Sequence, residues 1–294
     1  MPKIKETAGE KIFHWGIDLI LIFTCIISLY PVLYVLAASF SNPLLVMKNE
    51  ITIWPKGFTL IGYEKVFTNP DIWNGYVMTI LYTVIGTALN VLMTLLGAYP
   101  LSRKDFYGRK FWTVFLTFTM FFGGGMIPAY LLIQKIHMYN NFWVMIIPVV
   151  MGTYNVIIMR TFITSNVPLE LQESAVIDGA NDLVILVRVV VPLSIPVMAV
   201  MCLFYGVDHW NEYFRAMIYL QDRKLYPLQL ILREILVQNI VQKNVTQEML
   251  ADQKVIGESI KYALIIVATI PILMVYPFIQ KYFVKGMLIG SIKA

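Results

Sequence analysis

Hydrophobic residues along the chain gather into long uninterrupted runs and do not alternate with polar residues. A helix needs about twenty residues to cross the roughly 30 Å hydrocarbon layer of a bilayer, whereas the strands of a membrane barrel would alternate. Six runs are long enough, so the pattern predicts an all-α polytopic membrane protein with six transmembrane helices. These helices are expected at about Phe13–Phe40, Trp73–Tyr99, Phe111–Ile133, Phe142–Phe162, Leu193–Leu220 and Ser259–Phe283.

Lys and Arg residues near the ends of these runs predict how the chain is oriented. Segments rich in Lys and Arg stay on the cytoplasmic side of a membrane. Basic residues gather in both tails and in the loops after the second and fourth runs, so cytoplasmic N and C termini are expected. Two long segments, about 41–72 and 221–258, then lie outside. Apolar residues at helical spacing over Leu225–Val241 fit a helix on the membrane or on a partner, and equally a solvated surface loop.

Composition supports a membrane protein and excludes several other classes. Only 14% of the residues are charged, against roughly 25% in ordinary soluble domains. The net charge is +5, but the basic residues lie between apolar runs and not on one face, which indicates membrane topology and no nucleic-acid binding. The two cysteines lie inside apolar runs and the three histidines lie far apart. Neither a disulfide framework nor a metal site is therefore expected, and no cofactor is expected.

The loop between the fourth and fifth runs, 164–192, is too long for a simple connection and has the start signals of a short helix. Ser165 or Asn166 can cap this helix, and Pro168 suits its first turn. The acidic residues that follow favour the positive end of the helix dipole. Gly179 can end the helix or let a partner's backbone approach closely. A helix that rests on the membrane surface is the alternative interpretation.

Polar residues also occur within the fifth run. At about 100° per residue, four polar side chains and one tyrosine fall within an arc of about 120° on one helix. These residues are Tyr205, Asp208, Asn211, Glu212 and Arg215. Charged residues inside a membrane usually face a cavity or a partner, so this arc fits the polar lining of a pathway. The alternative is a structural ion pair between Glu212 and Arg215 that orders the outer end of the helix.

The loop after the fourth run resembles a known motif. Binding-protein-dependent ABC transporter permeases carry a cytoplasmic loop of the form E-A-A, three residues, G, nine residues and I-x-L-P. This chain has Glu173-Ser-Ala, Gly179 and Val189-Val-Val-Pro192 with every spacing kept. Serine replaces the middle alanine, and valine replaces both isoleucine and leucine, which are small or isosteric changes.

Other segments extend the resemblance over nearly the whole chain. They are Pro168-Leu-Glu-Leu-Gln-Glu, Ile177-Asp-Gly-Ala, Gly57-Phe-Thr-Leu, Trp210-Asn-Glu-Tyr and Gly286-Met-Leu-Ile-Gly-Ser-Ile-Lys, which match the carbohydrate branch of the family. The chain is most similar to the subunit related to the maltose permease. The segment Phe121-Phe-Gly-Gly-Gly-Met-Ile-Pro resembles the subgroup for oligosaccharide, polysaccharide and aldouronate uptake. The resemblance implies a type I ABC importer permease fold with one permease domain over 1–294, a coupling loop at 164–192 and a long extracytoplasmic loop at 221–258.

The resemblance also implies a function. The chain would be the transmembrane subunit of an ATP-driven importer in a bacterial plasma (inner) membrane, forming half of the pathway for a carbohydrate and most simply an oligosaccharide. It has no G-x-x-x-x-G-K-[ST] motif, so it is not expected to be an enzyme. Two copies of a cytoplasmic ATP-binding subunit would hydrolyse ATP. A second homologous permease and an extracytoplasmic solute-binding protein would complete the assembly.

Three groups of residues would carry this function. The ATPase-coupling residues implied by the resemblance are Glu170, Glu173, Ser174, Ala175, Asp178, Gly179 and Pro192. The polar arc of the fifth run would line the sugar pathway. Contacts to the binding protein are expected from the polar stretch of the long outer loop, at Gln242, Asn244 and Gln247.

Two other functions are considered. One is an ABC permease for a solute that is not a sugar. The other is a secondary transporter coupled to an ion gradient, although such carriers usually have more spans, internal repeats and broken helices around the site. A membrane-embedded enzyme is disfavoured because the chain lacks paired catalytic carboxylates, nucleophile–base spacing and grouped metal ligands.

Overall fold

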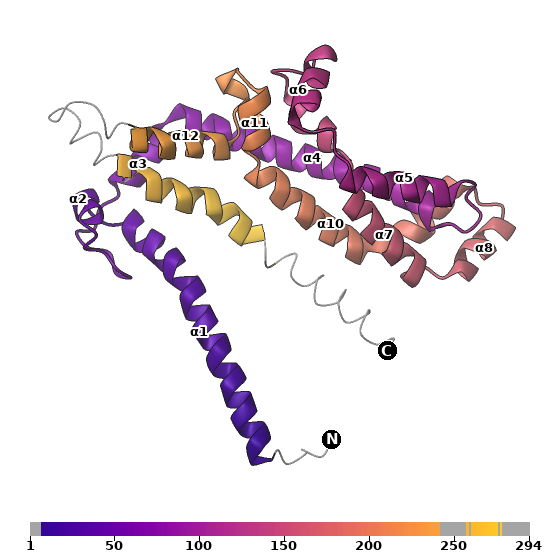
Figure 1. Cartoon of the computed structure of the whole chain (residues 1–294), viewed down its shortest axis with the longest axis horizontal. Helices are drawn as coiled ribbons and strands as arrows, with labels where there is room; N and C mark the ends of the chain where they lie inside the picture. Colours follow the sequence, from indigo (N-terminus) through magenta and orange to yellow (C-terminus); the bar gives the residue numbers. More distant parts are fainter. Residues whose placement is uncertain (1–6, 242–256, 259, 276, 278–294) are drawn as a thin grey trace. The chain divides into compact units, whose positions relative to one another are not determined.

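The computed structural model describes residues 7–241, 257, 258, 260–275 and 277, and every regular element in this part of the chain is helical. The chain forms two compact units (Figure 1). The first contains Met1–Asn69 and Glu234–Thr269, and the second contains Pro70–Arg233 and Ile270–Ala294. The predicted binding-protein contacts Gln242, Asn244 and Gln247 lie outside the described residues, as does most of the C-terminal tail.

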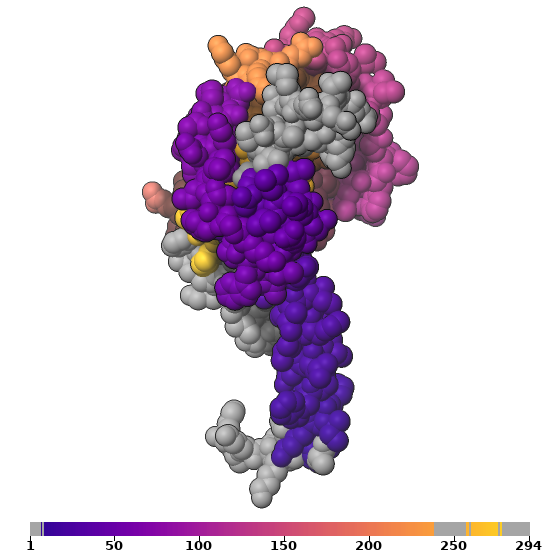
Figure 2. Space-filling model, turned by 90° about the vertical axis from the view of Figure 1, so that its left-hand side faces the viewer, coloured from indigo at the N-terminus to yellow at the C-terminus, as the bar shows by residue number. Residues whose placement is uncertain are grey.

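The first unit is dominated by one long apolar helix, α1 (Ala8–Ser39). Its side chains are exposed along most of its length, including Trp15, Phe23 and Leu29 (Figure 2, indigo). A lipid bilayer solvates such a helix well, because the backbone bonds are satisfied internally and the apolar side chains face hydrocarbon. The end of α1 packs on the short helix α2 (Pro43–Met47), where Ala37 and Val46 are buried. Helix α3 (Ile61–Thr68) completes the first long loop.

The second unit is built on three helices that lie side by side, the long α4 (Pro70–Ser102) and α10 (Val191–Asn211) and the shorter α7 (Thr153–Asn166) (Figure 1). Their facing side chains form the main core, which includes Leu95 of α4, Met159 of α7 and Met201 of α10. The remaining elements are α5 (Arg109–Phe121), α6 (Met126–Lys135), η1 (Phe142–Met145), η2 (Ile147–Val149), α8 (Leu169–Ile177), α9 (Asp182–Ile185), η3 (Leu186–Val190), α11 (Phe214–Tyr219), η4 (Arg223–Leu225) and α12 (Leu228–Val241).

Three helices of the described part are long and apolar enough to cross a membrane: Gly9–Ser39, Pro70–Ser102 and Asp182–Asn211. Five spans result if two bent pairs each count as one. The bend is 111° between α5 and α6 and 51° between the Phe142–Val149 segment and α7. The sequence predicted one span in each place, at about Phe111–Ile133 and Phe142–Phe162. Part of the sixth predicted helix is described as the apolar helix Ile260–Val275, and the rest lies outside the described residues.

Glycine and proline residues explain the two bends. Gly125 has a φ of +85° and forms the N-cap of α6 after the run of three glycines. Few other residues adopt this conformation without strain, so the helix cannot continue through it. In the second bend Pro148 lies in the 3₁₀ turn η2, and Gly152 is the N-cap of α7. Hydropathy alone does not register these interruptions, because glycine and proline occur often in transmembrane helices.

The fifth predicted helix has different ends in the structure. It begins at Asp182 and not at Leu193, since α9, η3 and α10 are continuous. The π-helical turn η3, in which the Val191 N–H bonds to Leu186, precedes a proline that has no N–H of its own. The helix ends at Asn211 and not at Leu220. Glu212 accepts a hydrogen bond from the backbone N–H of Arg215 at 2.8 Å, which starts the separate helix α11.

The predicted helix in the second long outer segment is confirmed as α12. Its first turns pack on α4 of the same chain. The Leu228 backbone N–H donates to Thr79 Oγ1 at 2.8 Å, and Leu228 and Ile231 are buried. The solvated loop is therefore excluded for this part of the segment.

Candidate coupling loop and membrane-embedded polar site

The coupling loop contains the predicted short helix, α8, but a different residue starts it. Ser165 and Asn166 belong to the last turn of α7, where the Asn166 side chain donates to the Phe162 carbonyl at 3.0 Å. They cannot also cap α8, so that prediction is wrong. Pro168 is the N-cap residue, without a side-chain hydrogen bond.

Gly179 ends this helix. Its φ is +81°, the Ala180 N–H bonds to the Ala175 carbonyl at 2.9 Å, and the Gly179 N–H bonds to the Val176 carbonyl at 3.0 Å. This pattern is a Schellman motif, which favours glycine because its left-handed conformation strains other residues. A Cβ at Gly179 would have no atom of the described residues within 4 Å. The helix-ending role is confirmed, and close approach by a partner stays a prediction.

Six of the seven predicted coupling residues lie together on α8 and the two residues after it. Glu170, Glu173, Ser174, Asp178 and Gly179 are exposed, and Ala175 packs against the main core. Ile177 is also 86% exposed. The loop therefore presents carboxylates and apolar side chains on one small surface that is exposed in the described part of the chain. Pro192 lies apart from them, exposed in the first turn of α10.

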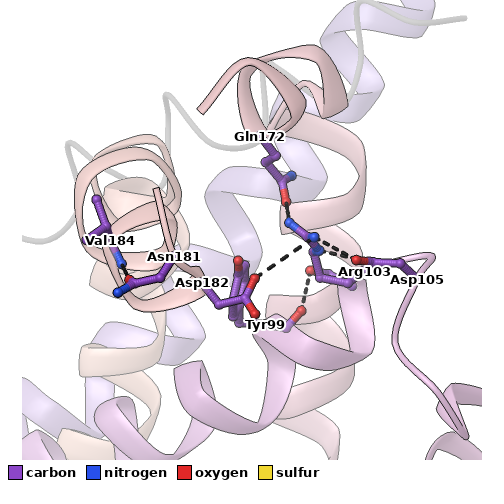
Figure 3. A network of polar contacts seen from close by, with 8 residues as sticks. Tyr99, Arg103, Asp105, Gln172, Asn181, Asp182 and Val184 are labelled. Carbon is purple, nitrogen blue, oxygen red and sulfur yellow. Dashed lines mark hydrogen bonds and ion pairs between the residues drawn. The ribbon is translucent and has the colours of Figure 1, made fainter. Parts of the chain in front are cut away.

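Arg103, directly after α4, joins the coupling loop to the long helices (Figure 3). Its Nη1 atom donates to Gln172 Oε1 of α8 at 3.3 Å, and its Nη2 atom lies 4.0 Å from Asp182 Oδ1 of α9. Two further bonds, of 2.9 and 2.7 Å, go to the carboxylate of Asp105. Gln172 is only 6% exposed. We call Arg103, Asp105, Gln172 and Asp182 the Arg103 cluster.

Within the Arg103 cluster the positive guanidinium lies beside the negative carboxylates of Asp105 and Asp182. Hydrogen bonds from Arg103 hold the pKa of the Asp105 carboxyl below its usual value of 3.8. The same contact raises the pKa of the guanidinium. The Asp105 side chain is 68% exposed, so water screens this pair and its net effect on stability is small. Its consequence is geometric, because the bidentate contact fixes the plane of the guanidinium that meets Gln172. In the sequence Arg103 is one of the basic residues after the second apolar run, and that position indicates only topology.

A second polar group lies where the Phe142–Val149 segment breaks from α7. The Gly152 N–H donates to the Tyr205 hydroxyl at 3.1 Å, and this hydroxyl lies 2.7 Å from Thr94 Oγ1. The Asn90 amide donates to the Val149 carbonyl at 2.6 Å. Side chains of α4 and α10 thus bond the backbone groups that the break frees, as broken transmembrane helices require.

His209 supports the same contacts. Its Nε2 lies 2.8 Å from Asn90 Oδ1, and the ring is buried. Gly86 makes room for it, since a Cβ at that position would collide with the imidazole. Among the described residues, no three His, Cys, Asp or Glu side chains group as a metal site would need.

A cavity of about 530 Å³ opens beside this break. Tyr154 and Asn155 of α7 line it together with Phe204, Tyr205 and Asp208 of α10. Two of the five residues predicted for the pathway, Tyr205 and Asp208, therefore meet at one cavity. Tyr205 is largely buried and its hydroxyl is bonded to Thr94 and Gly152, whereas Asp208 is exposed.

The other three predicted pathway residues do not line this cavity. The Asn211 side chain donates to the Val207 carbonyl at 2.9 Å. Glu212 and Arg215 form an ion pair with side chains 14% and 13% exposed, and Arg215 also donates to the Met145 carbonyl at 2.8 Å. This geometry favours the structural ion pair among the two alternatives. The helical arc that placed all five residues on one face fails because α10 ends at Asn211.

Comparison with known proteins gives similarity over nearly the full length. No protein-family model matches the chain. It is 39% identical over 284 residues to the polygalacturonan/rhamnogalacturonan transport system permease protein YtcP of Bacillus subtilis, covering 97% of this chain and 99% of that protein. It is 38% identical over 268 residues to protein LplC of the same organism, covering 91% and 90%.

A solved structure has the same fold. It is a chain from the crystal structure of a bacterial ABC transporter involved in the import of the acidic polysaccharide alginate. The TM-score is 0.87 at 30% sequence identity, covering 96% of this chain and 100% of the other. The similarity therefore includes α1, the coupling loop and the broken helices alike.

Proposed function

This chain belongs to the family of carbohydrate ABC transport system permeases, and from this membership we propose that it forms half of the translocation pathway of an ATP-driven oligosaccharide importer. The observation that carries the proposal is the coupling loop. It keeps every spacing of the family motif and presents its acidic and small residues on an exposed helix with a glycine-terminated end.

The number of transmembrane helices and the side on which the termini lie are part of the same proposal. Six transmembrane helices of a type I importer permease would cross a bacterial inner membrane, with both termini and the loop 164–192 in the cytoplasm. The three long apolar helices and two bent pairs support five of these spans, and the apolar helix Ile260–Val275 supports the sixth. The whole chain would form one permease domain, with 221–258 as an extracytoplasmic loop.

The partners follow from the family and from the exposed surfaces. ATP-binding subunits, a partner permease and a solute-binding protein belong to such importers in general. Two ATP-binding subunits would serve the pair of permeases, one docked on each coupling loop. In this chain Glu170, Glu173, Ser174, Ala175, Asp178 and Gly179 would form the docking surface. Pro192 would take part by setting the start of α10, and Gln242, Asn244 and Gln247 would contact the binding protein.

The cargo is proposed as an oligosaccharide. Relatives are named for polygalacturonan, rhamnogalacturonan and arabinooligosaccharides, and the neighbouring structure is named for alginate. A cavity with aromatic faces, an amide and a carboxylate suits hydroxyl-rich rings and supports this assignment. A cargo that is not a sugar has no comparable support in the chain.

The energy source distinguishes an ABC importer from an ion-coupled carrier. An affinity-tagged chain isolated from native membranes should copurify with an ATP-binding protein and a second permease. Uptake of a labelled oligosaccharide by cells should stop when ATP is depleted and persist when an ionophore collapses the ion gradients. Uptake that survives ATP depletion but stops with the ionophore would contradict the proposal and favour a secondary transporter.

A further inference from the structure

The cavity beside the helix break is lined by one carboxylate and no cation. Asp208 contributes the one charged side chain among its lining residues, and no lysine, arginine or histidine lines it. Two relatives are nevertheless named for the transport of carboxylated polymers: polygalacturonan/rhamnogalacturonan and alginate.

Asp208 needs a polar occupant. It lies in α10, which is long and apolar enough to cross a membrane, and its side chain is exposed. No hydrogen bond or ion pair of its carboxylate occurs within the described part of the chain. Neighbouring polar side chains on α10 are already engaged: His209 with Asn90, and Asn211 with the Val207 carbonyl. An ionised carboxylate facing lipid would be costly, so this side of the cavity faces a polar ligand or water.

The remaining lining fits a sugar ring. Tyr154 and Phe204 are 59% and 40% exposed and offer aromatic surface on two different helices. Aromatic surface packs against the apolar C–H face of a pyranose, while a carboxylate and the Asn155 amide can bond to its hydroxyl groups. The volume of about 530 Å³ falls within the usual range for small-molecule sites.

We propose that this cavity is a subsite for an uncharged sugar ring, with Asp208 and Asn155 as hydrogen-bonding groups and Tyr154 and Phe204 as the stacking surface. The inference rests on the proposed function and adds the class of sugar. A hydroxyl group donates to the Asp208 carboxylate. A uronate ring would instead bring a second negative charge beside it, without a cation in the lining to compensate. Asp208 therefore selects neutral rings, or the neutral residues of a mixed polymer, at this point of the pathway.

The test compares two saccharides of equal length in the complete transporter. Galactotriose and trigalacturonate serve as the neutral and acidic probes, and initial uptake rates are measured in cells that carry the wild-type chain, Asp208→Asn or Asp208→Glu. Asp208→Asn should lower the ratio of galactotriose to trigalacturonate uptake about tenfold, and Asp208→Glu should restore most of it. Glu50→Gln, an exposed carboxylate-to-amide change at a residue that does not line the cavity, should leave the ratio unchanged.

A second variant covers the case in which Asp208→Asn does not reach the membrane. Phe204→Leu keeps an apolar side chain but removes the ring, and it should raise the concentration for half-maximal uptake of galactotriose at least threefold. An unchanged uptake ratio in Asp208→Asn, or equal losses for both probes, would overturn the inference and assign Asp208 to assembly. Wild-type uptake of trigalacturonate alone would also overturn it, while leaving the importer function intact. Failure of the proposed function is distinct, since then neither saccharide would be taken up in an ATP-dependent way.

Discussion

Two side chains show how single residues hold this membrane protein in a bent conformation. Tyr205 bonds to Thr94 and to the backbone N–H of Gly152, and Arg103 bonds to Gln172 across the start of the coupling loop. Tyr205 of the long helix α10 thus bonds the N-cap residue of the shorter α7, and Arg103, directly after α4, bonds a side chain of the short helix α8. Within a bilayer no water replaces the Tyr205 hydroxyl, so this contact helps to determine the bend before α7, whereas the Arg103 contact positions the coupling loop.

Removing the Tyr205 hydroxyl should destabilise the helix break. In Tyr205→Phe the partly buried Gly152 N–H loses its acceptor, which costs about 1 kcal/mol and lowers the melting temperature of the purified protein by a few degrees. Tyr107→Phe is the matched control, because the Tyr107 side chain is 97% exposed. Equal melting temperatures for the two variants would show that the bond to Gly152 does not stabilise the break.

Arg103 should act on coupling more than on folding. Arg103→Ala removes the donor to the buried Gln172 amide and the charge beside Asp182, so α8 is less firmly joined to α4. We expect the sugar imported per ATP hydrolysed to fall at least about fivefold, with ATP hydrolysis itself retained. Arg103→Lys should recover only part of the ratio, because an ammonium cannot make the bidentate contact.

Lys104→Ala is the control for lost positive charge, since Lys104 is exposed next to Arg103. A normal import ratio in Arg103→Ala, or an equal decrease in Lys104→Ala, would contradict the coupling role. The Arg103–Asp105 pair should not make this ratio depend on pH in the neutral range. The depressed pKa of Asp105 means that its stabilising contribution is present above 3.8 and is lost only as the pH falls through the lower, folded-state value.

At the scale of elements, hydropathy predicted where helices lie but not where they stop. A run of apolar residues identifies a transmembrane helix because apolar side chains are stable in the hydrocarbon layer. Helices α1 and α4 agree with their predicted runs. The break before α7 depends on partners far away in sequence, such as Asn90 and Tyr205, which no local pattern reveals. The end of α10 depends on Glu212, whose carboxylate caps the next helix and does not extend the previous one.

The coupling loop was predicted more fully than the polar site. Its motif spacing is local, so Glu173, Ala175 and Gly179 could be placed on one short helix from the sequence alone. Gln172 was missed because its partner Arg103 lies 69 positions away. For the same reason the helical arc joined Asp208 with Glu212 and Arg215, although they lie on different elements in the structure.

At the scale of the whole molecule, the proposed function requires a transport pathway and a docking surface for an ATP-binding subunit in the same chain. It has no phosphate-binding motif, and its relatives over nearly the full length are transport permeases. Chemical energy would therefore have to enter through the exposed face of α8 and pass to α4 through the Arg103 cluster. The neutral-sugar cavity lies in the same compact unit as that loop, so the second unit contains both ends of the proposed coupling.

Saccharide-stimulated ATP hydrolysis in the reconstituted importer tests this account most directly, with Gly179→Leu compared with Gly179→Ala. Both variants carry the same strain at φ +81°, and within the described part of the chain neither side chain meets an atom near its Cβ, so they differ in the bulk presented to a partner. Gly179→Leu should lose stimulated hydrolysis at least tenfold beyond Gly179→Ala, with equal amounts of both in the membrane. Stimulated hydrolysis at the wild-type rate in both variants would contradict docking of an ATP-binding subunit on α8.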